Sequence, residues 1–272
     1  MSRLGDSAER DYSRKLQQFN RFAEPELVGL IQSCKLSSGM QVLDAGCGSG
    51  EALNWLQREV GAVPAVAGID LSAAHVAAAR KVAPSAQIHH GDLGAVPLPA
   101  GSVDFIWCVN TLNHLSDPAA GLLRLKELLR AGGRIAVGQS TLLPEMYFAW
   151  DARLERLVNE AVRQYYRARY ALQESDLSAV RALVGLLRGA RFGQVVSRTI
   201  AIERIAPLDA ATEAYLGETI FRDTWGERLR PYLSAEDFGS LQTLCNPLHA
   251  GYALRRPDFH FLQTFTLVCG QK

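Results

Sequence analysis

The chain has 272 residues, 48% of them hydrophobic, and its 29 Lys and Arg against 28 Asp and Glu give a formal net charge of +1 with neutral His. This balance is typical of folded proteins and lacks the basic excess of a nucleic-acid binder. No apolar run approaches the roughly 20 residues that a membrane-spanning helix needs, and the polar N-terminus has no signal-peptide core. We therefore expect a cytoplasmic protein whose partners include neither nucleic acid nor a membrane.

Strands and helices are predicted to alternate between residues 41 and 140. Short apolar runs predict strands at residues 41–46, 65–72, 86–90, 103–110 and 133–140, and helices are predicted at residues 51–60, 73–83 and 119–130. Asp117 and Pro118 mark the start of the last helix, and Gly132 and Gly133 its end. Apolar strands separated by helices indicate a parallel sheet covered on both faces, which is the doubly wound α/β class.

Two insertions interrupt this pattern after residue 140. The first contains an amphipathic helix whose apolar residues recur at helical spacing, namely Leu154, Leu157, Val158, Ala161, Val162 and Tyr165. A helix at about residues 176–187 and a strand at 194–205 follow, then a second insertion in which Ser234 and Asp237 form a capping-box-like helix start, then a last strand at 260–270. We expect one domain over residues 1–272, with a core at about 38–140, 173–205 and 259–272 and cap segments at about 1–37, 141–172 and 206–258.

The five cysteines are scattered, with no C-x-x-C pair and no histidine at metal-ligand spacing; they are Cys34, Cys47, Cys108, Cys245 and Cys269. This pattern argues against a disulfide framework and against structural zinc, and we expect no bound metal. Cys108 and Cys269 fall in apolar, strand-like stretches, where a free thiol acts as a small buried hydrophobic group.

A glycine-rich turn, Asp44-Ala45-Gly46-Cys47-Gly48-Ser49-Gly50, follows the first predicted strand. Glycine permits sharp bends and close approach to a ligand, and the N–H groups at the start of the next helix favour an anionic ligand group. The glycine spacing does not fit the G-x-G-x-x-G fingerprint of dinucleotide-binding folds, and no P-loop motif occurs. A P-loop nucleotidase is therefore excluded, and a nicotinamide dehydrogenase is a remote alternative.

The turn resembles the first motif of class I S-adenosylmethionine-dependent methyltransferases, D-x-G-x-G-x-G, with the type 11 group as the nearest relative. Three further positions agree in order and spacing: Asp70 after the second strand, Asp92 after the third, and residues 108–118 after the fourth. The resemblance covers about residues 38–140, and more loosely the chain to residue 200 and the last strand. It implies a seven-stranded, Rossmann-like sheet with an antiparallel last strand, and S-adenosyl-L-methionine as the cofactor.

The resemblance also implies a role for each matching residue. Asp70 would accept hydrogen bonds from both ribose hydroxyls, and Asp92 from the adenine amine. Leu71 and Leu93 would pack on the two adenine faces, the backbone around Gly46 would hold the methionine part, and Asn110 would lie beside the sulfonium. The predicted cofactor-binding residues are Asp44, Ala45, Gly46, Gly48, Gly50, Asp70, Leu71, Asp92, Leu93 and Asn110.

His114 is the titratable residue nearest to the expected methyl group, and we name it as the candidate catalytic residue. It could deprotonate a hydroxyl or amine acceptor, contact the cofactor or substrate, or serve local packing. His249 and His260 are alternative bases. We expect the remaining histidines on a helix surface and at strand edges, namely His75, His89 and His90.

The cap segments are expected to emerge at the carboxyl ends of the strands, where doubly wound sheets bind ligands. All eight tyrosines fall in these segments. Aromatic residues with a polar tip suit a mostly apolar small-molecule pocket, although they could equally pack the cap onto the sheet. The candidate substrate-binding residues are Tyr147, Trp150, Tyr166, Trp225 and His249.

We therefore predict a methyltransferase that acts on an O, N or C atom of a small organic acceptor in specialised or cofactor metabolism. In-line positioning and exclusion of water under a closed cap would drive the transfer. The alternatives are an S-adenosylmethionine-binding protein that catalyses another reaction, such as a cyclisation, and a non-catalytic partner subunit. The sequence is compatible with a monomer or a homodimer.

Overall fold

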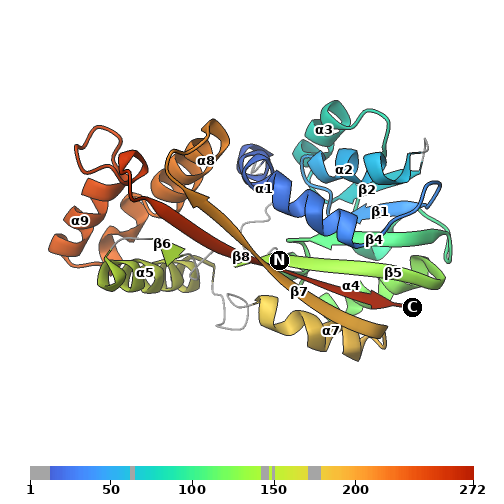
Figure 1. Cartoon of the computed structure of the whole chain (residues 1–272). Coiled ribbons are helices and arrows are strands. Elements are labelled where there is room, and N and C mark those ends of the chain that lie inside the picture. The colour runs from blue at the N-terminus through green and yellow to red at the C-terminus, as the bar shows by residue number, and fades with distance from the viewer. Residues whose placement is uncertain (1–12, 62–64, 142–146, 149–150, 171–178) are drawn as a thin grey trace.

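The computed structural model describes residues 13–61, 65–141, 147–148, 151–170 and 179–272 (Figure 1). Its sheet contains the seven predicted strands, β1 (Val42–Ala45), β2 (Val66–Asp70), β3 (Gln87–His90), β4 (Val103–Val109), β5 (Leu129–Ser140), β7 (Gly193–Ile205) and β8 (His260–Gln271). The order β3-β2-β1-β4-β5-β8 is completed by β7 on the other edge of β8, and β8 is antiparallel to both neighbours. The predicted fold class is confirmed. A two-residue strand that the sequence did not predict, β6 (Tyr147–Phe148), also pairs with β8.

Both faces of the sheet are buried. Phe105 and Trp107 of β4 belong to one apolar cluster, with residues of α1 (Ser13–Ser33), α2 (Glu51–Val60) and α3 (Ala73–Val82). Ile106 and Cys108, which alternate with them, belong to the other, with residues of α4 (Pro118–Leu128) and α7 (Leu183–Gly189). Strands buried on both faces require continuous apolar runs, which explains why the core strands were visible in the sequence.

The predicted start of α4 is confirmed, but its predicted end is wrong. Asp117 caps the helix by accepting from the N–H of Ala120 at 2.9 Å, and Pro118 occupies the first turn. The helix ends at Leu128 because Leu129 is already extended and pairs with Val103 of β4. Strand pairing therefore ends the helix before the glycines that follow.

The second insertion and α5 (Ala152–Tyr170) form a cap beyond the carboxyl ends of β1, β4 and β5 (Figure 1). Strands β7 and β8 extend beyond the end of β5 and form a two-stranded arm that leads to the cap. The last pair between β5 and β8 is Ser140 with Phe265, whereas the pairing of β7 with β8 continues to Ile205 and His260. The cap contains α8 (Ala210–Ala214), the π-helix η4 (Tyr215–Thr224), the 3-10 helix η5 (Glu227–Tyr232) and α9 (Ala235–Cys245). Ser234 caps α9 by accepting from the N–H of Asp237, as predicted.

Helix α1 lies between the core and the cap and contacts α2, α8 and η4 (Figure 1). On the core side, Asn20 donates to Glu51 at 2.9 Å. On the cap side, the ring of Phe22 stacks on Tyr215 with a centroid distance of 4.4 Å. Phe22 also meets Phe261 of β8 edge to face at 5.5 Å. This helix therefore ties the start of α2 to the cap.

The part of the chain that the structure describes contains no helix long and apolar enough to span a membrane. Its five cysteines are all free. Cys108 is fully buried as predicted, whereas Cys269 is partly exposed.

Candidate active site

The glycine turn after β1 requires glycine at two positions at least. Gly46 and Gly50 have φ angles of +82° and +95°, which side chains rarely tolerate. A Cβ atom on Gly46 would lie 2.3 Å from Oγ1 of Thr111, and one on Gly50 would lie 2.8 Å from Cα of Ala79. The turn is therefore packed between Thr111, two residues beyond the end of β4, and Ala79 of α3. Leu16 of α1 covers Gly48: a Cβ atom added to Gly48 would lie 3.1 Å from Cδ1 of Leu16.

Asp70, at the end of β2, faces this turn. Its Oδ2 accepts a hydrogen bond from the N–H of Gly48 at 2.9 Å, and its Oδ1 accepts one from the N–H of Ser72 at 2.9 Å and one from Nδ1 of His75 at 3.2 Å. Burial raises the pKa of Asp70, but these hydrogen bonds outweigh it and hold the pKa below its ordinary range. Asp70 is therefore an ionised, oriented acceptor at the carboxyl edge of the sheet.

Asp44 is the second carboxylate beside the turn. Its side chain is buried, and Oδ2 has no hydrogen-bond partner among the described residues. Burial, together with the neighbouring Asp70 and Glu51 carboxylates, raises the pKa of Asp44 to about 8. An acidic cluster with an unpartnered buried oxygen fits a cationic ligand, and S-adenosylmethionine carries both an ammonium and a sulfonium group.

The three residues predicted to contact adenine, Leu71, Leu93 and Asp92, differ in their solvent exposure. Leu71 is 54% exposed and presents an open apolar surface next to Asp70. Leu93 is buried in the core cluster that contains α4. Asp92 is exposed, and its Oδ1 accepts from the N–H of Gly94 at 2.7 Å, which leaves further acceptor capacity on the carboxylate. The adenine roles of these residues stay predictions.

Asn110 and His114 follow β4 at the same edge. The side-chain oxygen of Asn110 accepts from the N–H of Ser140 at 2.9 Å, so its amide NH2 is the group oriented for donation to a ligand. Asn110 has a φ of +51°, a strained conformation that often marks a functional site. His114 ends a 3-10 turn, Leu112–His114, and is half-buried. Its role as a base stays a prediction.

The predicted substrate residues are spread over the cap, and none of their roles is tested. Trp225 is buried and stacks on Phe221 with a centroid distance of 5.6 Å. Tyr166 is half-buried and meets Tyr165 edge to face at 5.4 Å. His249 is exposed, and its Nδ1 accepts from the N–H of a glycine two residues on. Tyr147 is described only as part of β6, and Trp150 lies outside the described residues.

Two further histidines, His75 and His260, form hydrogen bonds to acidic side chains. His75 was expected on a helix surface, but it is buried and paired with Asp70, because Ser72 starts α3 so close to the strand end that the third helical residue turns back onto the sheet. His260, an alternative base, lies 2.7 Å from Oε1 of Glu203 at an exposed position on the arm.

The sequence did not point to Gln263, and it offered Tyr215 only as one of eight tyrosines in the cap segments. Tyr215 of η4 and Gln263 of β8 are both fully buried. The Tyr215 hydroxyl and both polar atoms of the Gln263 amide lack a hydrogen-bond partner of good geometry among the described residues, although the amide lies beside the hydroxyl. Burial raises the pKa of Tyr215 above its ordinary range. One signal was available: Gln263 interrupts the inward apolar series Phe261, Phe265 and Leu267.

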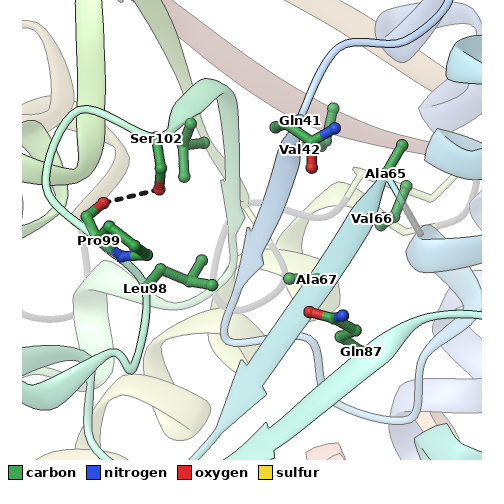
Figure 2. A pocket seen from close by; sticks show the side chains of 10 residues that line it. Gln41, Val42, Ala65, Val66, Ala67, Gln87, Leu98, Pro99 and Ser102 are labelled. Atoms are coloured by element: carbon green, nitrogen blue, oxygen red, sulfur yellow. Dashed lines mark hydrogen bonds between the residues drawn. The ribbon is translucent and has the colours of Figure 1, made fainter. Parts of the chain in front are cut away.

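A separate cavity of about 240 Å³ lies at the opposite edge of the sheet (Figure 2). It is lined by the amino ends of β1 and β2 and by the loop before β4, in which the Ser102 hydroxyl donates to the carbonyl of Pro99 at 2.7 Å. Gln41 and Gln87 are among its polar lining residues. This cavity contains none of the predicted site residues, and doubly wound folds bind their ligands at the other edge.

Comparison with known proteins agrees with the geometry of the carboxyl edge. A family model described as a methyltransferase domain matches residues 43–137. The malonyl-[acyl-carrier protein] O-methyltransferase of Enterobacter lignolyticus is 30% identical over 217 residues, which cover 72% of this chain and 83% of that protein. The chain spans only 33%, 50% and 40% of the length of three curated relatives with stronger matches.

Solved structures share the fold over almost the whole chain. The YcgJ protein from Bacillus subtilis has a TM-score of 0.55 at 19% identity, covering 91% of this chain and 98% of that one. The [4+2]-cyclase SpnF has a TM-score of 0.51 at 17% identity, covering 100% of this chain and 86% of that one. At these identities the likeness shows the fold alone.

Proposed function

We propose, because this chain belongs to the class I S-adenosylmethionine-dependent methyltransferase family, that it transfers the methyl group of S-adenosylmethionine to an uncharged oxygen-bearing group of a small, mostly apolar organic acceptor. S-adenosylmethionine is the cofactor of this family. The observation that carries the acceptor class is the buried pair of Tyr215 and Gln263. The O-methyltransferase name of the relative from Enterobacter lignolyticus supports oxygen as the methylated atom.

The surroundings of Tyr215 and Gln263 are apolar and aromatic, with the ring of Phe22 stacked on Tyr215 and Phe261 two residues before Gln263 on the same face of β8. A buried polar group without a partner costs about 1 to 3 kcal/mol, so these atoms favour a ligand that completes their hydrogen bonds. A hydroxyl and an amide match a neutral carbonyl or hydroxyl group. Among the described residues no charged group acts on Tyr215, so a charged ligand group would find no countercharge from them.

The position of this pair relative to the cofactor turn supports the same reading. Phe265, two residues beyond Gln263 on the same face, pairs with Ser140, and Ser140 donates to Asn110. These contacts connect Asn110, beside the expected sulfonium, to Gln263 through the paired strands β5 and β8. An acceptor oriented by Gln263 and Tyr215 can present its oxygen toward Asn110.

The mechanism follows from what these residues do. Asp70 would hold the ribose, Asp44 would face the cationic methionine part, and Asn110 would donate through its amide. The cofactor, when bound, supplies an electrophilic methyl group and leaves as S-adenosylhomocysteine. The cap would exclude water and orient the acceptor oxygen toward the cofactor, and a nearby base such as His114 would receive the proton that the acceptor loses.

A reaction other than methyl transfer is the second candidate, because the cyclase SpnF shares this fold along the whole chain. Both reactions use the same cofactor site, so product analysis separates them. Methyl transfer yields S-adenosylhomocysteine and methylated product in equal amounts, whereas a cyclisation consumes no S-adenosylmethionine.

The test is a screen in which purified protein and S-adenosylmethionine are mixed with a panel of neutral phenols and alcohols and a matched panel of charged carboxylates and amines, each analysed by mass spectrometry for S-adenosylhomocysteine and methylated product. Equal formation of both, with Gln263→Met raising the acceptor KM and leaving cofactor affinity unchanged, supports the proposal. Preferred methylation of charged acceptors contradicts the acceptor class. No binding of either sulfur compound by calorimetry contradicts the enzyme itself and favours a non-catalytic subunit.

A further inference from the structure

His75 is the third residue of α3, and the geometry of the helix start fixes its direction. Ser72 is the N-cap, and its hydroxyl accepts from the N–H of His75 at 3.4 Å. In a capping box, the side chain at this third position reaches back to the N–H of the cap residue. Here the Asp70 carboxylate accepts from the N–H of Ser72, and the His75 ring bonds to Asp70 instead.

The hydrogen bond orders both partners. The side chains of His75 and Asp70 are only 10% and 13% exposed, so neither ring nor carboxylate can turn freely into water. Because Asp70 is ionised and can only accept, Nδ1 of His75 carries the hydrogen. With Gly48 on Oδ2 and Ser72 and His75 on Oδ1, three donors from the glycine turn and the start of α3 define the plane of the carboxylate.

The hydrogen bond from His75 also offsets unfavourable electrostatics at Asp70. It lies close enough to Asp44 to raise the pKa of that buried carboxyl, and Glu51 acts on Asp44 in the same direction. Like charges at short range favour protonation of one of them, and burial adds to that effect. Among the contacts that lower the pKa of Asp70, the hydrogen bond from His75 has the largest effect.

We propose that His75 is a positioning residue for cofactor binding: by donating from Nδ1 to Oδ1, it keeps Asp70 ionised and oriented for the ribose hydroxyls of S-adenosylmethionine. This inference rests on the proposed function, in which Asp70 binds the ribose. His75 itself does not touch the cofactor. Its loss therefore weakens recognition of the ribose and leaves the rest of the cofactor site in place.

The test compares two amide variants of the full chain. In His75→Asn the amide nitrogen falls near the position of Nδ1 and can still donate to Asp70, whereas in His75→Gln it falls near the position of Nε2 and cannot. His75→Leu removes every donor. Binding of S-adenosylhomocysteine and of its 2′,3′-dideoxy analogue is measured by calorimetry, and circular dichroism checks that each variant is folded.

We expect His75→Leu and His75→Gln to weaken binding of S-adenosylhomocysteine about tenfold, with His75→Asn within about threefold of the natural protein. For the dideoxy analogue, which lacks both ribose hydroxyls, all four proteins should bind alike. Equal loss for both ligands, or no rescue by His75→Asn, overturns the positioning role. If the natural protein does not bind S-adenosylhomocysteine, the proposed function fails as well. This result differs from equal binding by the natural protein and all variants, which would contradict only the positioning role of His75.

Discussion

The carboxylate of Asp70 accepts a hydrogen bond from the backbone N–H of Gly48 at 2.9 Å, which fastens the end of β2 to the glycine turn after β1. The contact orients the acceptor and the turn together before any ligand arrives. Because such preorganisation lowers the cost of ordering on binding, it supports a cofactor site that is largely formed in the free protein.

Replacing Asp70 tests the ribose assignment. Asp70→Asn keeps an oxygen for the N–H of either Gly48 or Ser72, but not both, and removes the charge, and we expect it to weaken cofactor binding by about 1.5 to 3 kcal/mol, the usual range for hydrogen bonds to a charged group. Calorimetric titration with S-adenosylhomocysteine measures the change. Unchanged affinity in a folded variant would rule out Asp70 as the ribose ligand.

Cofactor binding should release a proton near neutral pH. With a pKa of about 8, Asp44 is mostly protonated at pH 7 in the free protein, and a cationic ligand group beside it favours the carboxylate. Affinity for S-adenosylmethionine should therefore rise with pH up to about pH 8. Titration in two buffers of different ionisation enthalpy counts the proton, and Asp44→Asn should abolish the release. An identical count in both proteins would assign the proton to another group.

The raised pKa of Asp44 should also make the stability of the free protein depend on pH: stability should fall as pH rises, whereas cofactor affinity should increase. An unfolded aspartate titrates at about pH 3.9, so between that pH and about pH 8 the folded protein holds a proton on Asp44 that the unfolded chain has lost. The unfolding free energy then falls as pH rises, by up to about 1.4 kcal/mol per pH unit from this group. Urea unfolding at pH 5 and pH 8 should show Asp44→Asn gaining stability relative to the natural protein at the higher pH. A constant difference would mean that Asp44 titrates alike in both states.

His114 is tested by separating binding from chemistry. If it accepts the acceptor proton, His114→Ala should lower kcat by about 10²-fold or more and leave cofactor affinity intact. Steady-state kinetics on an acceptor from the screen, together with calorimetry, gives both values. A rise in the cofactor Kd with unchanged kcat would identify His114 as a cofactor contact.

We expect the polar groups of Gln263 and Tyr215 to bind the acceptor but to lower the unfolding free energy of the free protein. Because their polar atoms have no partner of good geometry among the described residues, Gln263→Met and Tyr215→Phe should leave the free protein as stable as before, or more stable by about 1 kcal/mol. Thermal unfolding of the cofactor-free protein measures this. A loss of more than about 2 kcal/mol would show that a buried water or a protein group satisfies them in solution.

The sequence by itself determined the sheet and the cofactor turn. Core strands buried on both faces need continuous apolar runs, and the turn needs glycine where Thr111 and Ala79 leave no room for a side chain, so both requirements act on neighbouring residues and leave a local pattern. The caps at Asp117 and Ser234 were visible for the same reason.

Only the tertiary structure decided which polar groups meet. The sequence predicted His75 on a helix surface, but His75 is buried, and its burial depends on how closely α3 follows β2. Gln263 and Tyr215 come together because η4 and β8 both pack against Phe22 of α1, which contacts Tyr215 and Phe261, residues far apart in the chain. Periodicity reports which face of an element is buried, but the partner on that face is fixed by the packing of whole elements, which no local pattern records.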